Sequence, residues 1–413
     1  MGQTLSEPVK EKHTVSGHDD RILYASSAMQ GWRISMEDAH TATLKLLDKK
    51  GYSYFGVYDG HGGQNVAKYS GNNLHARIAR DKDFDKDLKA AIQNGFLGTD
   101  DDLKNDPQFA NDPSGCTAVM AIVTPNNEIY VGNAGDSRAV LSVDGEAVQM
   151  SEDHKPVNKG EADRISKAGG FVEFGRVNGN LALSRALGDF EFKQNPKFKA
   201  DEQIVTAYPD VKNEEIKTDS TEFLVLACDG IWDCLSSQQV VSFIRKNLSE
   251  HKDLRKACED LMERCLANDS ELGGIGCDNM TVIVVGFLHN RSEKDWYEWM
   301  AKRYGEIGPK YQEEQPKPTK EEQNLNGENI DDDVSMTGLE PNDDLSIDGR
   351  VDSSDSIKST DSNRSDSTDS FSSDSSRNYN TPSGNNNNPG TEGNRSSPRT
   401  TPPLRGPDNT PPP

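Results

Sequence analysis

Three acidic turns that lie far apart in the sequence each adjoin an apolar run of strand length. Asp59-Gly60 and Asp229-Gly230 follow such runs, and Asp278-Asn279 precedes one. Because a strand bounded by an acidic turn presents a carboxylate at the edge of its sheet, these turns can contribute to one site. Carboxylate oxygens without clustered Cys or His favour Mg²⁺, Mn²⁺ or Ca²⁺ over Zn²⁺. The three turns therefore predict a site for hard divalent metal ions.

A polar segment from Arg33 to Asp38 follows another short apolar run. Along an extended chain, Arg33, Ser35 and Glu37 share one face, which places a guanidinium beside a carboxylate at a sheet edge. The planar guanidinium of arginine matches two phosphate oxygens at once. Taken alone the segment could be a surface ion pair, but beside a metal site it indicates that a phosphate group is bound.

The individual motifs also have ordinary interpretations. Asp59-Gly60 alone is a common turn, and His61 alone is commonly a structural or surface histidine. Asp136, in the segment 135–138, has the position of a hairpin residue, and we interpret His154 as structural. A chemical role for these residues therefore depends on several motifs occurring together.

The elements that must position these residues are short strands and a few helices within the first 290 residues. Runs such as 281–285 are apolar on both faces, which indicates strands buried on both faces. Most connections are too short for crossover helices, so antiparallel pairing is favoured. We expect an α+β fold, a four-layer αββα sandwich of two antiparallel sheets flanked by helices. The predicted strands are 21–28, 31–35, 52–58, 116–123, 128–133, 138–143, 223–228 and 280–287, and the predicted helices are 64–79, 86–104, 159–168, 237–247 and 254–267.

The composition divides the chain into four parts. Residues 1–20 are interpreted as an N-terminal arm, and 21–290 as a globular domain that holds the predicted metal site. Residues 291–308 predict a docked helix, because Trp, Met and Tyr side chains recur there on one helix face. Residues 309–413 are rich in Asp, Ser, Asn and Pro and cannot bury enough apolar surface to offset their chain entropy. We expect this tail to be disordered.

The charge and the cysteines limit the partners and the compartment. The formal net charge is -23, and residues 321–374 alone carry 16 acidic and 3 basic residues. Such a chain repels nucleic acid and anionic membranes, so neither is expected as a partner. The six cysteines form no CxxC pair and indicate free thiols in a reducing compartment. With no signal peptide or membrane-spanning run, the expected location is the cytoplasm and nucleus.

The N-terminus matches an acylation pattern. Gly2 and Ser6 have the spacing expected for N-myristoylation, although an unmodified arm is the alternative. A single myristoyl chain would give at most weak, reversible membrane attachment.

Nine segments, in order, resemble the type 2C protein phosphatases, the metal-dependent Ser/Thr family. This resemblance covers roughly residues 20–290, and the acidic tail is similar to that of fungal members by composition only. One segment would be moderately specific, whereas nine in the family's order are very specific. The matching segments are 33–38, 58–63, 114–118, 133–138, 153–156, 176–179, 183–189, 229–233 and 278–279.

The resemblance implies two Mn²⁺ or Mg²⁺ ions. Asp59 would bridge both ions, Glu37 and the Gly60 carbonyl would complete one site, and Asp229 and Asp278 would complete the other. Two divalent ions can lower the pKa of a shared water, and the resulting hydroxide would attack phosphorus.

Other residues receive roles from the same resemblance. Asp38 would hold metal-bound water from a second shell. Asp136 and Asp233, with Asp229, would form a weaker third metal site. Arg33 would bind the substrate phosphate.

His61 would protonate the leaving serine or threonine oxygen, a role that suits an imidazole. The segment 155–189 resembles the flap beside the site, with Arg176 as a candidate substrate contact.

These observations predict a monomeric protein serine/threonine phosphatase that acts on phosphorylated proteins. By resemblance to fungal members, its substrates would be protein kinases of stress or cell-cycle signalling. Serines in 362–376 lie beside aspartates and resemble substrates of acid-directed kinases. The competing hypotheses are a catalytically silent scaffold with a binding tail and a metal-dependent hydrolase of nucleic acids or small phosphate esters. The complete ligand set disfavours the scaffold, and the acidity disfavours a nucleic-acid substrate.

Overall fold

The computed structural model describes residues 4–270 and 274–308. Gly2 and the tail from residue 309 lie outside the described residues, so the expectations about them remain predictions.

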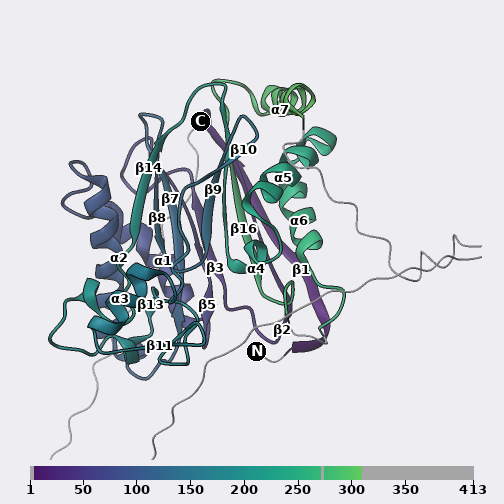
Figure 1. Cartoon of the computed structure of the whole chain (residues 1–413). Coiled ribbons are helices and arrows are strands. Elements are labelled where there is room, and N and C mark those ends of the chain that lie inside the picture. Colours follow the sequence, from purple (N-terminus) through teal and green to yellow (C-terminus); the bar gives the residue numbers. More distant parts are fainter. Residues whose placement is uncertain (1–3, 271–273, 309–413) are drawn as a thin grey trace, which may run out of the picture. The chain divides into compact units, whose positions relative to one another are not determined.

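Two antiparallel sheets form the centre of the domain (Figure 1). The six-stranded sheet has the order β1-β2-β16-β15-β9-β10, and the five-stranded sheet has the order β14-β8-β7-β4-β3. The strands of the first sheet are β1 (Thr4–His18), β2 (Ile22–Arg33), β16 (Met280–Phe287), β15 (Thr221–Ala227), β9 (Arg138–Val143) and β10 (Glu146–Gln149). Those of the second are β14 (Asp210–Glu215), β8 (Glu128–Ala134), β7 (Ala118–Val123), β4 (Ser53–Tyr58) and β3 (Ala39–Thr43).

Helices cover the outer face of each sheet. Helices α1 (Asn65–Ala79) and α2 (Leu88–Asn105) pack on the five-stranded sheet, and α5 (Ser237–His251) and α6 (Leu254–Cys265) on the six-stranded sheet (Figure 1). This is the predicted four-layer αββα sandwich. Short elements complete the fold: α3 (Lys159–Lys167), α4 (Asp229–Trp232), β5 (Gly60–His61), β6 (Gly115–Cys116), β11 (Val172–Glu173), β12 (Arg176–Val177), β13 (Leu187–Gly188), η1 (Pro107–Phe109), η2 (Phe190–Phe192) and η3 (Ala200–Glu202).

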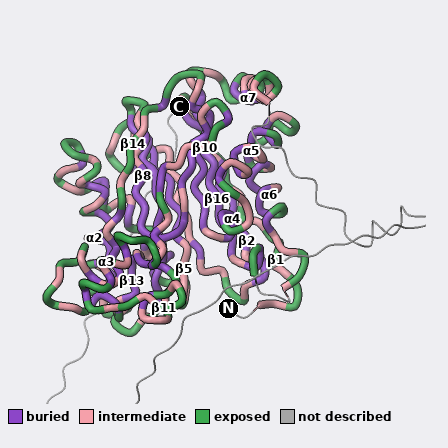
Figure 2. The backbone as a smooth tube through the Cα atoms, viewed as in Figure 1, coloured by how far each residue is buried: buried purple, intermediate pink, exposed green. Residues whose placement is uncertain are grey.

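Strands that are apolar on both faces contact two different cores, one on each face. In β16, Ile283, Val285 and Phe287 face the core between the sheets. Val282 and Val284 alternate with them and join the core beneath α5 and α6. The buried residues accordingly concentrate along the strands, and the exposed ones along the outer helices and loops (Figure 2).

The N-terminal residues differ from the prediction. Residues 4–18, expected as an arm, form β1, an edge strand that pairs antiparallel with β2. Most β1 side chains are exposed or half-buried, so its sequence lacks the apolar alternation by which strands are recognised. Its position is set by backbone hydrogen bonds to β2, which composition does not reveal.

The segment after residue 20 also differs. The two predicted strands 21–28 and 31–35 are one strand, β2, because residues 22–29 pair with β16 while β1 extends the pairing to Arg33. The following residues 34–38 are not a strand.

Helix α7 (Glu293–Ile307) lies where the docked helix is expected, and it packs beside α5 (Figure 1). Its Trp296 and Met300 are fully buried in the core under α5 and α6. Its Arg303 donates a hydrogen bond to the buried Glu222 carboxylate, which also pairs with the buried Arg245. The helix is therefore part of the folded domain.

Replacing Trp296 by Ala is expected to lower the free energy of unfolding by about 3 kcal/mol, the lower end of the range for a buried Trp. The lower end applies because Trp296 Nε1 has no hydrogen-bond partner, so its removal also relieves a buried unpaired donor. Urea denaturation of the purified protein measures this change. Glu298→Ala, on the exposed side of the same helix, is the matched control and should stay near the parent value; equal stability of both variants would show that α7 is not docked.

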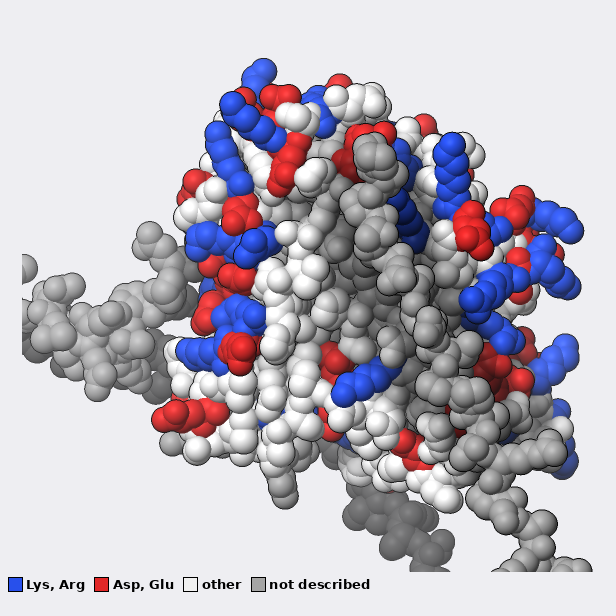
Figure 3. Space-filling view, turned by 180° about the vertical axis from the view of Figure 1, so that it is seen from behind, with Lys and Arg blue, Asp and Glu red and all other residues white. Residues whose placement is uncertain are grey.

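The surface carries interspersed charges. On the face opposite to that of Figure 1, Lys and Arg side chains alternate with Asp and Glu along both flanks (Figure 3). Among the described residues, no helix combines the length and the apolar character that crossing a membrane requires.

Candidate active site

The acidic turns meet at one end of the sandwich. Strand β4 ends immediately before Asp59, β15 ends two residues before Asp229, and β16 begins two residues after Asp278. Strands β15 and β16 are antiparallel neighbours, with Ala227 opposite Val282, so the end of one lies beside the start of the other. The five-stranded sheet brings Asp59 to them from across the core.

Six carboxylates share this end of the domain, and we call them the acidic cluster. Asp38, Asp59 and the Cys228 thiol place one potential ligand atom each within 4.8 Å of one another. The carboxyls of Asp38 and Asp229 are both within hydrogen-bonding reach of Asp59. The charges of Asp136 and Asp278 raise the pKa values of both Asp59 and Asp229, and the charge of Asp233 raises that of Asp229. The cluster consists of Asp38, Asp59, Asp136, Asp229, Asp233 and Asp278.

Burial and mutual repulsion raise the pKa values of four members of the cluster. Burial, and then the charges of Asp229 and Asp38, raise the pKa of Asp59 well above its usual range. Burial raises the pKa of Asp38 to about 6, although a hydrogen bond from Thr281 partly opposes the shift. Burial also raises the pKa values of Asp229 and Asp233. The cluster therefore holds more negative charge than its protein surroundings balance.

The donor atoms of the cluster fit hard divalent ions. Within the described residues, two of the six carboxylates form salt bridges, Asp278 with Arg33 and Asp136 with Lys155. A buried carboxylate is stable when it is paired or bound to metal, and oxygen donors suit Mg²⁺ and Mn²⁺. Cys228 is a poor ligand, because burial raises the pKa of its thiol and its Sγ donates to the Asn279 carbonyl. The residues present therefore fit the metal site that the sequence predicts.

Glu37 and Gly60 lie against each other beside the cluster. A Cβ added to Gly60 would stand 2.3 Å from the Glu37 carbonyl oxygen, so only glycine allows this approach. The Glu37 carboxylate accepts hydrogen bonds from Ser35 Oγ at 2.8 Å and from the Gly63 amide at 3.1 Å. The structure brings both residues to the predicted position, and their coordination of one ion remains a prediction.

Asn279, whose turn the sequence pattern identified without giving its side chain a role, organises the segment 34–38. Its side-chain amide donates to the carbonyls of Gln30 and Ser35, at 2.8 and 3.0 Å. Its Oδ1 accepts from the Glu37 amide at 2.9 Å. The chain bends at residues 34 and 35, so the extended face predicted for Arg33, Ser35 and Glu37 is wrong for Arg33, whereas the Ser35 and Glu37 side chains do meet.

An extended segment would place Arg33 beside Glu37, but the Arg33 guanidinium pairs with Asp278 instead. Its Nη2 donates to Asp278 Oδ2 at 2.6 Å, across the β2–β16 pair. The Arg33 side chain is 40% exposed, so its guanidinium is accessible from solvent beside the cluster. This position suits the predicted binding of a phosphate.

His61 lies on β5, two residues after Asp59, and contacts Asp189. Its Nε2 is 2.8 and 2.9 Å from the two carboxylate oxygens of Asp189. Burial alone would lower the pKa of His61, but the hydrogen bond and the charge of Asp189, with those of Asp136 and Glu37, outweigh it. The pKa of His61 is therefore raised, which favours the proton-carrying form of a general acid.

Asp136 lies in the turn between β8 and β9 and contacts Lys155 Nζ at 2.5 Å. The turn is held by His154, whose Nδ1 accepts from the Gly135 amide while Nε2 bonds Asp210. His154 is thus structural, as predicted. Asp136 and Asp233 are close enough for the charge of Asp136 to raise the pKa of Asp233, although burial is the larger cause.

Arg176 lies in the β11–β12 hairpin, and its guanidinium donates to the Asn180 carbonyl at 2.7 Å. Among the described residues, its side-chain hydrogen bonding goes to the segment just after β12 and does not reach the acidic cluster. Its contact with substrate remains a prediction.

Comparison with known proteins decides the family. A model of the family "Protein phosphatase 2C" matches residues 22–272. The chain belongs to the protein phosphatase 2C family. A "Protein phosphatase 2C homolog 2" of Hypocrea jecorina is 54% identical over 312 residues, which cover 73% of this chain and 71% of that protein. A "Probable protein phosphatase 2C" of Caenorhabditis elegans is 54% identical over 293 residues, covering 71% of this chain and 82% of that protein.

Solved structures agree on the fold of this protein phosphatase 2C. A phosphatase from Toxoplasma gondii has a TM-score of 0.59 and 24% identity, over 68% of this chain and 96% of that one. The family match, together with an acidic group that could hold metal, makes the protein a metal-dependent protein serine/threonine phosphatase.

Proposed function

We propose that the acidic cluster binds two divalent ions, Mn²⁺ or Mg²⁺, with Asp59 between them. The observation that carries this proposal is the position of Asp59, a half-buried residue whose carboxyl is in reach of both Asp38 and Asp229. Asp59 is thus a carboxylate with further acidic groups on two sides, as a bridging ligand requires. Asp229 and Asp278 would hold one ion, and Glu37 with the Gly60 carbonyl the other. Asp136 and Asp233 support a weaker third site.

The ions, when bound, would lower the pKa of a water and offset the negative charge of the phosphoryl group. Arg33 binds two phosphate oxygens through its guanidinium and orients the phosphorus toward the acidic cluster. Asp38, whose Oδ2 accepts a hydrogen bond from Thr281 at 2.7 Å, is fixed where it can orient the attacking water. His61 donates a proton to the serine or threonine oxygen as the P–O bond breaks.

The substrates that we propose are phosphoserine and phosphothreonine in signalling proteins, including kinases of stress and cell-cycle pathways, in the cytoplasm and nucleus. This proposal rests on the family and on its resemblance to fungal members. The acidic tail would select partners and be regulated by phosphorylation, and acylation of Gly2 would give weak membrane attachment.

Hydrolysis should depend on added metal and not on a thiol. The purified protein is incubated with a phosphothreonine peptide after exhaustive chelation, and then with Mn²⁺ or Mg²⁺ restored. We expect activity to disappear on chelation and to return with either ion, because the donor set consists of oxygen atoms. A thiol-alkylating reagent should leave the chemical step unchanged, since burial raises the pKa of Cys228 and keeps it a thiol.

The same assay separates the competing functions. A phosphatase of proteins should hydrolyse the peptide far faster than ATP or a dinucleotide. Full activity without metal would contradict the proposed mechanism, preference for the nucleotides would favour the alternative hydrolase, and no activity on any substrate would favour the scaffold.

A further inference from the structure

The ring of His61 is oriented by one side chain, the Asp189 carboxylate. Both Asp189 oxygens lie within 2.9 Å of His61 Nε2. Because an ionised carboxylate only accepts hydrogen bonds, Nε2 must carry the proton of that contact. This leaves Nδ1 as the nitrogen that can exchange a proton with substrate, and no described residue forms a hydrogen bond with Nδ1. The side chain of His61 is 28% exposed, so the ring is accessible.

The small sheet β5-β6-β13 is built to allow this contact. His61 pairs with Gly115, and Gly115 pairs with Gly188, the residue before Asp189. A Cβ on Gly115 would stand 2.2 Å from Asp189 Oδ2 and 2.7 Å from His61 Nε2. Glycine at this position therefore leaves the space in which the two side chains meet.

The backbone at Asp189 is held in an uncommon conformation. Its φ is 48°, in the left-handed region that non-glycine residues rarely occupy, and its side chain is only 5% exposed. Residues held in such a conformation cluster at functional sites, where the surrounding structure must maintain them.

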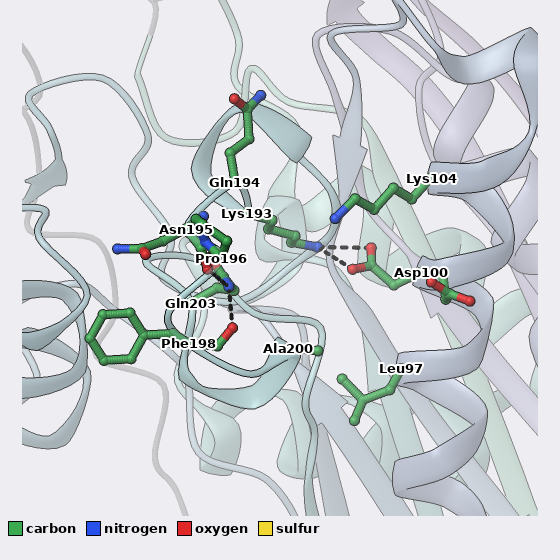
Figure 4. A pocket seen from close by; sticks show the side chains of 11 residues that line it. Leu97, Asp100, Lys104, Lys193, Gln194, Asn195, Pro196, Phe198, Ala200 and Gln203 are labelled. Carbon is green, nitrogen blue, oxygen red and sulfur yellow. Dashed lines mark hydrogen bonds and ion pairs between the residues drawn. The ribbon is translucent and has the colours of Figure 1, made fainter.

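A buried ion pair maintains this loop from behind. Lys193 Nζ lies 2.8 and 2.9 Å from the two oxygens of Asp100 on α2. Lys193 also donates to the Ala186 carbonyl, and Asp100 accepts from the Gly188 amide. Figure 4 shows Lys193 reaching Asp100 from the segment that faces α2 across a pocket. The pair thus fixes both ends of the short segment that carries Asp189.

We propose that Asp189 is a positioning residue of the phosphatase, which fixes the His61 ring so that Nδ1 faces the leaving oxygen of the phosphoester. This inference rests on the proposed role of His61 as proton donor. In the reaction the oxygen of water forms a bond to phosphorus and the P–O bond to threonine breaks. The Nδ1 proton goes to the threonine oxygen, and the proton released by the attacking water restores the charge of His61 through solvent.

The test is a double-mutant cycle of Asp189 and His61 with two substrates, a phosphothreonine peptide and p-nitrophenyl phosphate. Asp189→Ala should lower kcat on the peptide about 10–100-fold, on the scale of removing a carboxylate that orients a metal-bound imidazole. The loss on p-nitrophenyl phosphate should be smaller, because its leaving group needs little protonation. Added to His61→Gln, Asp189→Ala should have little further effect.

Asp189→Asn keeps the volume and one acceptor oxygen, and it provides the same test if the Ala variant fails to fold. We expect its loss to be smaller than that of Asp189→Ala, again confined to the peptide and absent in the His61→Gln background. Equal losses on both substrates, or losses that add to those of His61→Gln, would overturn the inference. If His61→Gln itself showed equal losses on both substrates, the proposed role of His61 would be wrong, so the two failures are distinguishable.

Discussion

Replacing Asp59 by Asn is expected to lower kcat/KM on a phosphothreonine peptide by roughly 10³-fold or more, since bound ions supply several kcal/mol of transition-state stabilisation. The amide retains the shape of the side chain but removes the charge between the two proposed ions. Metal affinity and catalysis should therefore fail together. The measurement is the rate as a function of Mn²⁺ concentration for the parent and the variant.

Asp260→Asn is a matched control, because this carboxylate lies on α6 and bonds Asn247 and Lys256 instead of the cluster. It should leave the metal dependence unchanged. Asp229→Asn and Asp278→Asn should each weaken one ion. Near-normal turnover by Asp59→Asn, with the parent's metal dependence, would contradict the bridging role.

Replacing His61 by Gln should reduce turnover of phosphothreonine by roughly 10²–10⁴-fold, the usual contribution of a general acid. Aryl phosphates have a better leaving group and should lose much less. The comparison of phosphothreonine peptide with p-nitrophenyl phosphate, at saturating metal, measures the difference.

His289→Gln serves as the control, since this half-buried histidine bonds the Thr221 carbonyl and lies outside the proposed machinery. It should leave both rates unchanged. Equal losses on the two substrates in His61→Gln would show that His61 supports the structure or the metal ligands.

The sandwich could be predicted from the sequence because its inner strands are apolar on both faces. The alternation in β16 reflects two cores, one on each side of the strand, and two sheets packed face to face with helices outside supply both. Strand β1 could not be predicted in this way. It lies at a sheet edge with mostly polar side chains, so its pairing depends on main-chain bonds that any sequence can form.

The position of the carboxylates was also readable, since Asp59, Asp229 and Asp278 adjoin recognisable strands. The contacts that support these carboxylates and His61 were not. Asp189 is 128 positions from His61, and the two meet only through the register of β5, β6 and β13. Lys155 and Asn279 contact the site through turns whose shape depends on tertiary packing. Charged residues at strand ends can thus be predicted from the sequence. The residues that orient them can be identified only once the fold is known.

The most direct test of the account is the anomalous diffraction of crystals of the protein grown with Mn²⁺, measured at the manganese absorption edge. The account predicts two strong peaks about 3.5–4 Å apart, the spacing typical of two-metal sites, with the Asp59 carboxylate between them. A single peak, or peaks that do not touch Asp59, would contradict the central claim that Asp59 joins two catalytic ions.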